Sequence, residues 1–235
     1  MRFGIAVFPG TWSDRDCAHA ASLAGQESVS LWHKEADLRG ADCVILPGGF
    51  SYGDHLRAGA IARFAPLMEA VVDFARRGGL VWGICNGFQI LCEAHLLPGA
   101  LMRNASLEFR CVPCHLRVET LDCPYTAALS RGDVLEVPAS HGEGRYVAEP
   151  QTLLELEGQD RVVFRYTSPE GGPAGEEWNP NGAMRDIAGI VNAERNVLGM
   201  MPHPERSCEA LLGSADGLRL FSSVARALDR EGALL

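Results

Sequence analysis

The chain has 235 residues, with 21 Lys plus Arg against 30 Asp plus Glu, so its formal net charge is -9. This acidic balance, in which no basic stripe stands out, argues against nucleic acid or an anionic membrane as a partner. The length suits one well-buried α/β core, and we therefore expect a single domain over residues 1–235 that acts on a small-molecule substrate.

The first apolar stretch and the cysteine content bear on where the protein works. Met1 to Phe8 is too short for a signal peptide or a membrane span, and it runs directly into Pro9-Gly10. The sequence therefore predicts a cytoplasmic protein. In that compartment the eight cysteines are expected to be reduced and mostly packed in the core.

The first half of the chain alternates predicted strands with predicted helices. The strands are Arg2 to Phe8, Val29 to Trp32, Asp42 to Leu46 and a fourth that ends at Cys85. The helices are Ser13 to Ala24 with Ser13 as N-cap, Ala60 to Arg76, and one that begins near Gly87. This alternation predicts a doubly wound, flavodoxin-like, mostly parallel sheet covered by helices on both faces, with its site beyond the carboxyl ends of the strands.

The second half follows a different pattern. Short alternating runs from Arg110 to Val147, and further strands at Arg161 to Thr167, Ile187 to Val191 and Val197 to Met200, predict antiparallel additions to the sheet. The segment Ser168 to Asp186 is rich in Gly, Pro and Glu, which predicts a surface loop. An amphipathic helix is expected over Asp216 to Arg230.

Cys85 occupies the pattern of a nucleophile elbow. It follows an apolar strand and stands between Gly83 and Gly87, where a sharp strand-to-helix turn leaves no room for a Cβ. We expect the sulfur to be held out into solvent at the N-terminus of the next helix. The helix dipole contributes only about 0.3–1 kcal/mol, which is too little to ionise most of a free thiol at neutral pH, so a histidine must assist.

His203 lies in a segment suited to this task. Both Met201 and His203 precede prolines, and a residue before proline is pushed into extended geometry. In an extended chain alternate side chains share a side, so His203 and Glu205 should project together. A carboxylate beside an imidazole fixes its tautomer and stabilises its charged form. Cys85, His203 and Glu205 are therefore a candidate triad.

Gly48 and Gly49 supply a candidate oxyanion hole. They follow the predicted strand that ends at Leu46, and their amides can approach a developing negative charge closely. Together with the triad, these amides indicate acyl transfer through a thioester. The alternative for the two glycines is a plain turn after a strand.

Simpler interpretations exist for the other candidates. Cys85 alone could be a core residue and His203 a structural histidine, but the two motifs together favour catalysis. Cys111 and Cys114 have the spacing of half a zinc site, yet no second pair follows, so we interpret them as packing residues. His141 either lines the site or caps a strand, and the sequence does not choose between these roles.

Six blocks of sequence, in order along nearly the whole chain, resemble the class I (triad) glutamine amidotransferases, and within them the glutaminase subunits that serve purine biosynthesis. The blocks are Pro47 to Asp54, Cys85 to Leu91, His141 to Gly144, Asn179 to Gly182, Met200 to Arg206 and Gly213 to Gly217. The resemblance departs at Trp12-Ser13, where the family often has Asn-Cys, and it leaves the role of that loop open.

The resemblance implies roles for five residues. Cys85 is the nucleophile that attacks the side-chain amide of glutamine, His203 is the base, and Glu205 orients the imidazole. The amides of Gly49 and Asn86 form the oxyanion hole.

The same resemblance places Gln89 in the glutamine pocket and leaves His141 as a further candidate for glutamine binding. It also implies that ammonia passes to a separate synthetase subunit that uses ATP and Mg, joined by a small accessory subunit. This chain would bind no cofactor and no metal. Its one lysine, Lys34, follows no glycine-rich phosphate loop, which fits that division of labour.

Two other classes of function remain as alternatives. A stand-alone cysteine hydrolase could share the elbow, and a regulatory subunit could sense glutamine without turning it over. Amidotransferases that serve anthranilate, guanylate or carbamoyl phosphate synthesis would use the same chemistry, because the acceptor site lies on another chain.

Overall fold

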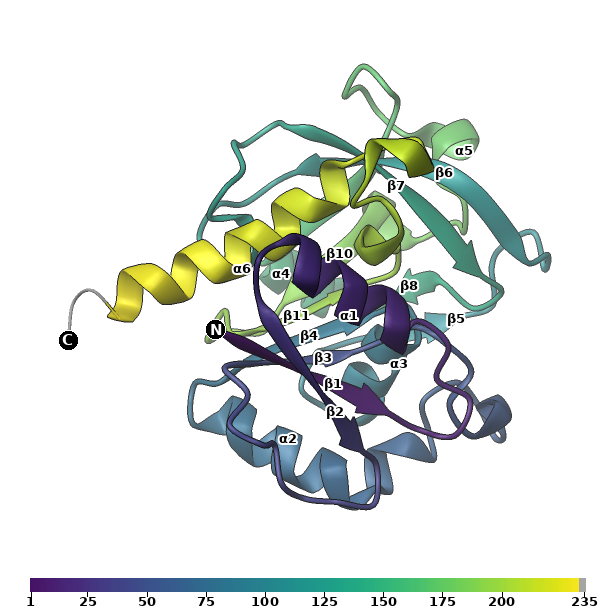
Figure 1. Cartoon of the computed structure of the whole chain (residues 1–235). Coiled ribbons are helices and arrows are strands. Elements are labelled where there is room, and N and C mark those ends of the chain that lie inside the picture. Colours follow the sequence, from purple (N-terminus) through teal and green to yellow (C-terminus); the bar gives the residue numbers. More distant parts are fainter. Residues whose placement is uncertain (233–235) are drawn as a thin grey trace.

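The computed structural model describes residues 1–232, with side chains described as far as residue 229. Its centre is a nine-stranded sheet with the strand order β2-β1-β3-β4-β11-β10-β9-β6-β7 (Figure 1). The first five strands in this order run parallel: β2 (Glu27–Trp32), β1 (Arg2–Val7), β3 (Cys43–Leu46), β4 (Leu80–Ile84) and β11 (Val197–Met200). The other four are antiparallel: β10 (Ile187–Val191), β9 (Val162–Thr167), β6 (Arg110–Val118) and β7 (Val134–His141).

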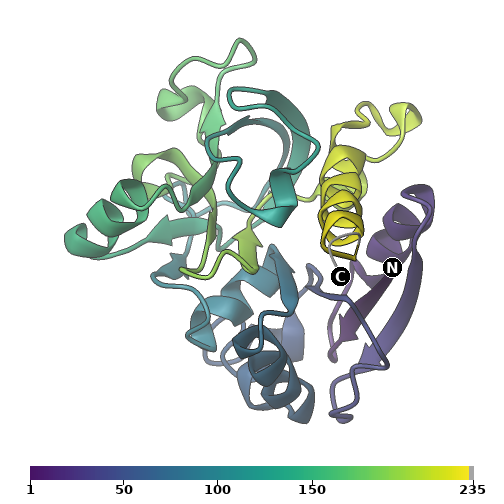
Figure 2. The ribbon, with the colours of Figure 1, turned by 90° about the vertical axis from the view of Figure 1, so that its left-hand side faces the viewer.

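Helices cover both faces of the parallel half (Figures 1 and 2). On one face α1 (Asp14–Leu23) and α6 (Asp216–Gly232) contact each other, while α2 (Pro66–Arg76) and α3 (Asn86–Glu93) pack against β4 on the other. The doubly wound sheet with antiparallel additions is therefore confirmed. The chain leaves β1 toward β2 on one side and returns to β3 on the other, which creates a switch point where ligands commonly bind.

Several local expectations were wrong or incomplete. The predicted helix from Ala60 begins only at Pro66, because Ala65 before that proline is extended with ψ 145°. Ser13 occupies the N-cap position of α1, but its hydroxyl caps nothing and instead accepts a hydrogen bond from Arg206 at 2.8 Å. The loop Ser168 to Asp186 contains the short helix α5 (Gly175–Trp178).

A two-stranded sheet pairs β5 (Ala100–Met102) with β8 (Arg145–Val147), and α4 (Pro150–Gly158) precedes β9. Neither β5 nor α4 was predicted from the sequence, and β8, at the end of the Arg110 to Val147 runs, was expected in the main sheet. Among the described residues no helix is long and apolar enough to cross a membrane.

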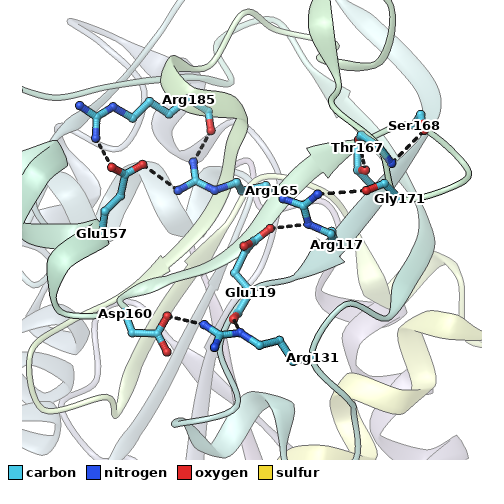
Figure 3. A network of polar contacts seen from close by, with 11 residues as sticks. Arg117, Glu119, Arg131, Glu157, Asp160, Arg165, Thr167, Ser168, Gly171 and Arg185 are labelled. Carbon is cyan, nitrogen blue, oxygen red and sulfur yellow. Dashed lines mark hydrogen bonds and ion pairs between the residues drawn. The ribbon is translucent and has the colours of Figure 1, made fainter.

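Charged side chains connect the outer elements of the antiparallel half (Figure 3). Glu157 at the end of α4 pairs with both Arg165 and Arg185, and Asp160 accepts a hydrogen bond from Arg131 at 2.8 Å. Such exposed pairs contribute little stability one by one. None of these residues lines the pocket described below.

Candidate active site

The register between β4 and β11 brings two distant motifs together. Ile84 pairs with Met200, and the amide of Cys85 donates to the Met200 carbonyl at 2.8 Å. Cys85 ends one strand and His203 follows its neighbour, so both reach the same edge of the sheet. Both side chains line one pocket.

The elbow has the tight geometry that its glycines predict. Cys85 has φ 51° and ψ -106°, a strained conformation that a surrounding structure must hold in place. A Cβ on Gly83 would stand 2.6 Å from the carbonyl carbon of Gly87, and one on Gly87 would overlap the carbonyl oxygen of Leu46. The need for glycine at both positions is confirmed.

The expectation that the sulfur stands out in solvent was wrong. Cys85 is only 5% exposed, and its thiol donates to the carbonyl of Ser140 at 3.7 Å. Ser140 belongs to β7, which is remote in sequence, and the loops around it enclose the elbow. The nucleophile candidate thus lies on the floor of a pocket.

His203 and Glu205 form a buried pair. Nδ1 of His203 lies 2.6 Å from Oε1 of Glu205, and both side chains are almost fully buried. Burial alone would lower the pKa of His203, but the negative charges of Glu205 and Cys85 outweigh it and raise the pKa to about 10. The predicted extended geometry was only partly right, because Pro204–Arg206 forms a 3-10 turn.

The other ring nitrogen of His203, Nε2, has no partner like the carboxylate of Glu205 among the described residues. Nε2 is buried and has no well-formed hydrogen bond within the described chain, while the sulfur of Cys85 lies close enough to act on the pKa of the ring. Gly48 packs against the same ring, since a Cβ there would stand 2.6 Å from Cε1 of His203. A protonated imidazole in this place stabilises a thiolate and can donate a proton to a leaving group.

Two backbone amides near Cys85, those of Gly49 and Asn86, are the candidates for the oxyanion hole. Gly49 has φ 150° and is bridged to Thr11 through the amides of Trp12 and Phe50, which leaves its own N–H without a backbone acceptor in residues 1–232. Asn86 is the first residue of α3, where helical amides have no intrahelical partner. Gly49 lines the same pocket as Cys85, and Asn86 directly follows Cys85 in the chain, so both amides stay candidates for the oxyanion hole.

The pocket has a volume of about 670 Å³. It contains the predicted residues Cys85, Gln89, His141, His203 and Gly49, and it adds others: Trp12, Phe50, Asp54, Phe109, Ser140, Gly142, Glu143 and Arg206. Gln89 donates to the carbonyl of Glu143 at 2.7 Å and accepts from Asn86 at 2.9 Å. Its side chain therefore connects the elbow helix to the loop after β7.

His141 both ends β7 and lines the pocket, so the two roles left open by the sequence are compatible. Nδ1 lies 3.3 Å from Oδ1 of Asn104, and Nε2 lies 3.5 Å from Nδ2 of Asn181. Burial, with the charge of His203 as a smaller cause, lowers the pKa of His141 to about 4. The ring is neutral at pH 7, which sets it apart from His203.

Sequence reasoning missed the residues that form the pocket's rim and one acidic wall. Trp12, 70% exposed, contacts Phe50, which in turn contacts Phe109. Asp54 and Glu143 are the carboxylates of the lining. Three of these residues, Phe50, Asp54 and Glu143, lie inside the blocks that carry the resemblance. Their position in those blocks was the signal in the sequence that could have identified them.

Metal binding finds no support in the described residues, where no group of three or more His, Cys, Asp or Glu side chains could hold an ion. Cys114 is buried, as expected for a packing residue, but Cys111 is exposed. Residues three apart on a strand point to opposite faces, which explains the split.

Comparison with known proteins agrees with this geometry. The profile of the CobB/CobQ-like glutamine amidotransferase domain matches residues 1–218. The chain belongs to this glutamine amidotransferase family. Among its amidotransferase relatives, a protein of Moorella thermoacetica named phosphoribosylformylglycinamidine synthase subunit PurQ is 56% identical over 227 residues, covering 95% of each chain. The protein of the same name from Koribacter versatilis is 55% identical over 230 residues, covering 97% of this chain and 99% of that one.

A solved amidotransferase structure is also similar. The chain matches one chain of the structure of PurLQS from Thermotoga maritima with a TM-score of 0.86 and 40% identity, over 97% of this chain and 98% of that one. The similarity therefore extends over nearly the whole chain.

Proposed function

We propose that this chain is the glutaminase subunit of a phosphoribosylformylglycinamidine synthase, a carbon-nitrogen ligase with glutamine as amido donor. The observation that carries the proposal is that one pocket brings together the elbow cysteine Cys85, His203 with its buried partner Glu205, and Gly49. The names of the full-length relatives support the choice of acceptor, which lies outside this chain.

The first half-reaction forms a thioester. The thiolate of Cys85 attacks the side-chain amide carbon of glutamine, and the amides of Gly49 and Asn86 donate to the resulting oxyanion. His203, protonated and held by Glu205, gives its proton to the departing nitrogen, so that ammonia leaves as the carbon-nitrogen bond breaks. A preorganised donor of this kind typically contributes about 2.7–4 kcal/mol to the transition state.

The second half-reaction releases glutamate. His203, now neutral, takes a proton from water, whose oxygen attacks the thioester carbon while the same amides hold the oxyanion. The carbon-sulfur bond breaks, and the thiolate and imidazolium are restored. Gln89 and His141 line the pocket that holds the glutamine side chain during both steps.

The ammonia would pass to partner subunits. The PurLQS structure supports a PurL-type synthetase, which uses ATP and Mg to convert formylglycinamide ribonucleotide to formylglycinamidine ribonucleotide, together with a small PurS-type subunit. We therefore expect the chain to act in purine biosynthesis and to work in the cytoplasm.

The test separates the two ammonia sources in the reconstituted complex. Cys85→Ala should abolish synthesis from glutamine while synthesis from free ammonia continues. Cys111→Ala, which alters an exposed cysteine outside the pocket, serves as the matched control and should retain both activities. Survival of glutamine-driven synthesis in Cys85→Ala would overturn the proposal.

A further inference from the structure

One wall of the pocket is formed by a strained turn. In Ser51–Asp54 the residues Tyr52, Gly53 and Asp54 all have left-handed backbones, with φ 54°, 69° and 52°. Non-glycine residues pay for this conformation, so the surroundings must enforce it. The amide of Ser51 donates to Asn86 at 3.2 Å, and the hydroxyl of Tyr52 lies 2.6 Å from Nδ1 of His33.

The turn brings the carboxylate of Asp54 to the pocket, and within the described part of the chain no cationic side chain forms an ion pair with it. Its side-chain contact is the amide of Asn86, at a long 3.4 Å. Burial, followed by the negative charge of Glu143, raises the pKa of Asp54 to about 6, and no cation contributes. At neutral pH a half-buried carboxylate thus faces a second carboxylate, an arrangement that a bound cation would relieve.

The other charged groups of the pocket already have ionic partners. Glu143 pairs with Arg103 at 3.7 Å. Arg206 donates to Ser13 and pairs with Asp16, and His203 is paired with Glu205. Asp54 is therefore the lining residue best placed to bind a positive charge on a ligand. It also lies near the reacting centre, since Asn86, which it contacts, directly follows Cys85.

We propose that Asp54 determines substrate specificity by receiving the α-ammonium group of the amino-acid substrate, with Glu143 adding negative charge at longer range. The inference rests on the proposed glutaminase function. In glutamine a short aliphatic chain separates the side-chain amide from the α-ammonium group. When the amide lies at Cys85, the ammonium group therefore reaches a neighbouring wall of the pocket. The pocket would then reject amides that lack the ammonium.

The experiment compares glutamine with 4-carbamoylbutyrate, which has the same amide and carboxylate but no α-amino group. Hydrolysis of both is measured in the reconstituted complex for the unaltered chain and for Asp54→Asn, which keeps the shape and tolerates a left-handed backbone. Asp160→Asn is the matched control, because Asp160 has φ 53° and lies outside the pocket.

Loss of a charge-assisted contact predicts that Asp54→Asn lowers kcat/KM for glutamine by at least about tenfold, mainly through KM, and leaves kcat/KM for 4-carbamoylbutyrate unchanged. Glu143→Gln, as a second variant, should also lower the ratio of kcat/KM for glutamine to kcat/KM for 4-carbamoylbutyrate. An equal effect on both substrates, or no effect on either, would overturn the inference while leaving the proposed function intact. An unaltered complex that hydrolyses no glutamine would overturn both.

Discussion

Gly83 and Gly87 approach so closely that a Cβ on Gly83 would stand 2.6 Å from the carbonyl carbon of Gly87. These two glycines bracket Cys85 and permit its strained backbone. On the far side, Gly87 touches the carbonyl of Leu46 in β3. The position of Cys85, the proposed nucleophile, therefore depends on contact between two adjacent parallel strands and the helix that follows one of them.

The first prediction concerns this contact. Gly87→Ala forces a methyl group into the backbone of Leu46, so we expect a loss of about 2–3 kcal/mol in the free energy of unfolding. Glutaminase activity should fall further than stability, because the elbow must shift. Gly158→Ala, whose Cβ would enter open space, is the control for denaturant unfolding. Equal stability of the two variants would contradict the packing described.

The second prediction concerns the His203–Glu205 pair. Glu205→Gln removes the strongest of the charges that raise the pKa of His203, so the ring should lose its proton at lower pH. In a comparable triad, removal of the orienting carboxylate costs about 10⁴ in kcat. We expect a loss of similar order in glutamine hydrolysis, together with slower alkylation of Cys85 by iodoacetamide at pH 7. Alkylation at an unchanged rate would show that the pair does not activate the thiol.

The features that could be predicted from the sequence are those that depend on local steric contacts and on the order of strands and helices along the chain. Glycine spacing at Cys85 and the alternation of strands and helices were sufficient to place Cys85 at the end of a strand. The prolines beside His203 predicted an extended chain, and the structure turns instead at Pro204. The contact between His203 and Glu205 is nevertheless formed, because a tight turn also brings close neighbours together.

The sequence could not predict features that arise from distant segments meeting. Burial of Cys85 depends on Ser140, far along the chain, and no pattern near the elbow reports it. The hydroxyl of Ser13 does not cap α1 as expected, because it accepts a hydrogen bond from Arg206 instead. The orientation of Asp54 depends on a run of left-handed residues held by contacts to other elements, which periodicity does not encode.

The third prediction follows from His141. Burial holds its pKa near 4, below the ordinary value of 6.5, so the unfolded chain binds a proton more readily than the folded one. The corresponding stability is fully present above about pH 6.5 and is lost as the pH falls toward 4, by up to about 2–3 kcal/mol. In His141→Gln the unfolding free energy should depend less steeply on pH in this window. Identical slopes for the two proteins would contradict it.

The fourth prediction concerns Asp54, whose contribution to stability depends on pH in the opposite direction to that of His141. Its pKa is raised from 3.8 to about 6, so the folded chain holds this proton more tightly than the unfolded chain and stability falls as the pH rises through that range. The full displacement corresponds to roughly 3 kcal/mol, and solvent screening of a half-buried group reduces it to about 1–2 kcal/mol. Asp54→Asn should therefore be more stable than the unaltered chain above pH 6, with the difference vanishing below about pH 4.

Urea unfolding from pH 4 to 8 measures this difference directly, and the other titrating groups cancel because both proteins contain them. Asp160→Asn, at a similar backbone angle, should show no comparable gain. A gain at neutral pH would mean that the chain retains an unfavourable carboxylate at the pocket wall, as expected where function and stability conflict. If glutamine were then added, its ammonium should stabilise the unaltered chain more than Asp54→Asn, since only the former offers the charge that it neutralises. If glutamine stabilised both proteins equally, burial of Asp54 would cost stability, but Asp54 would have no role in binding glutamine.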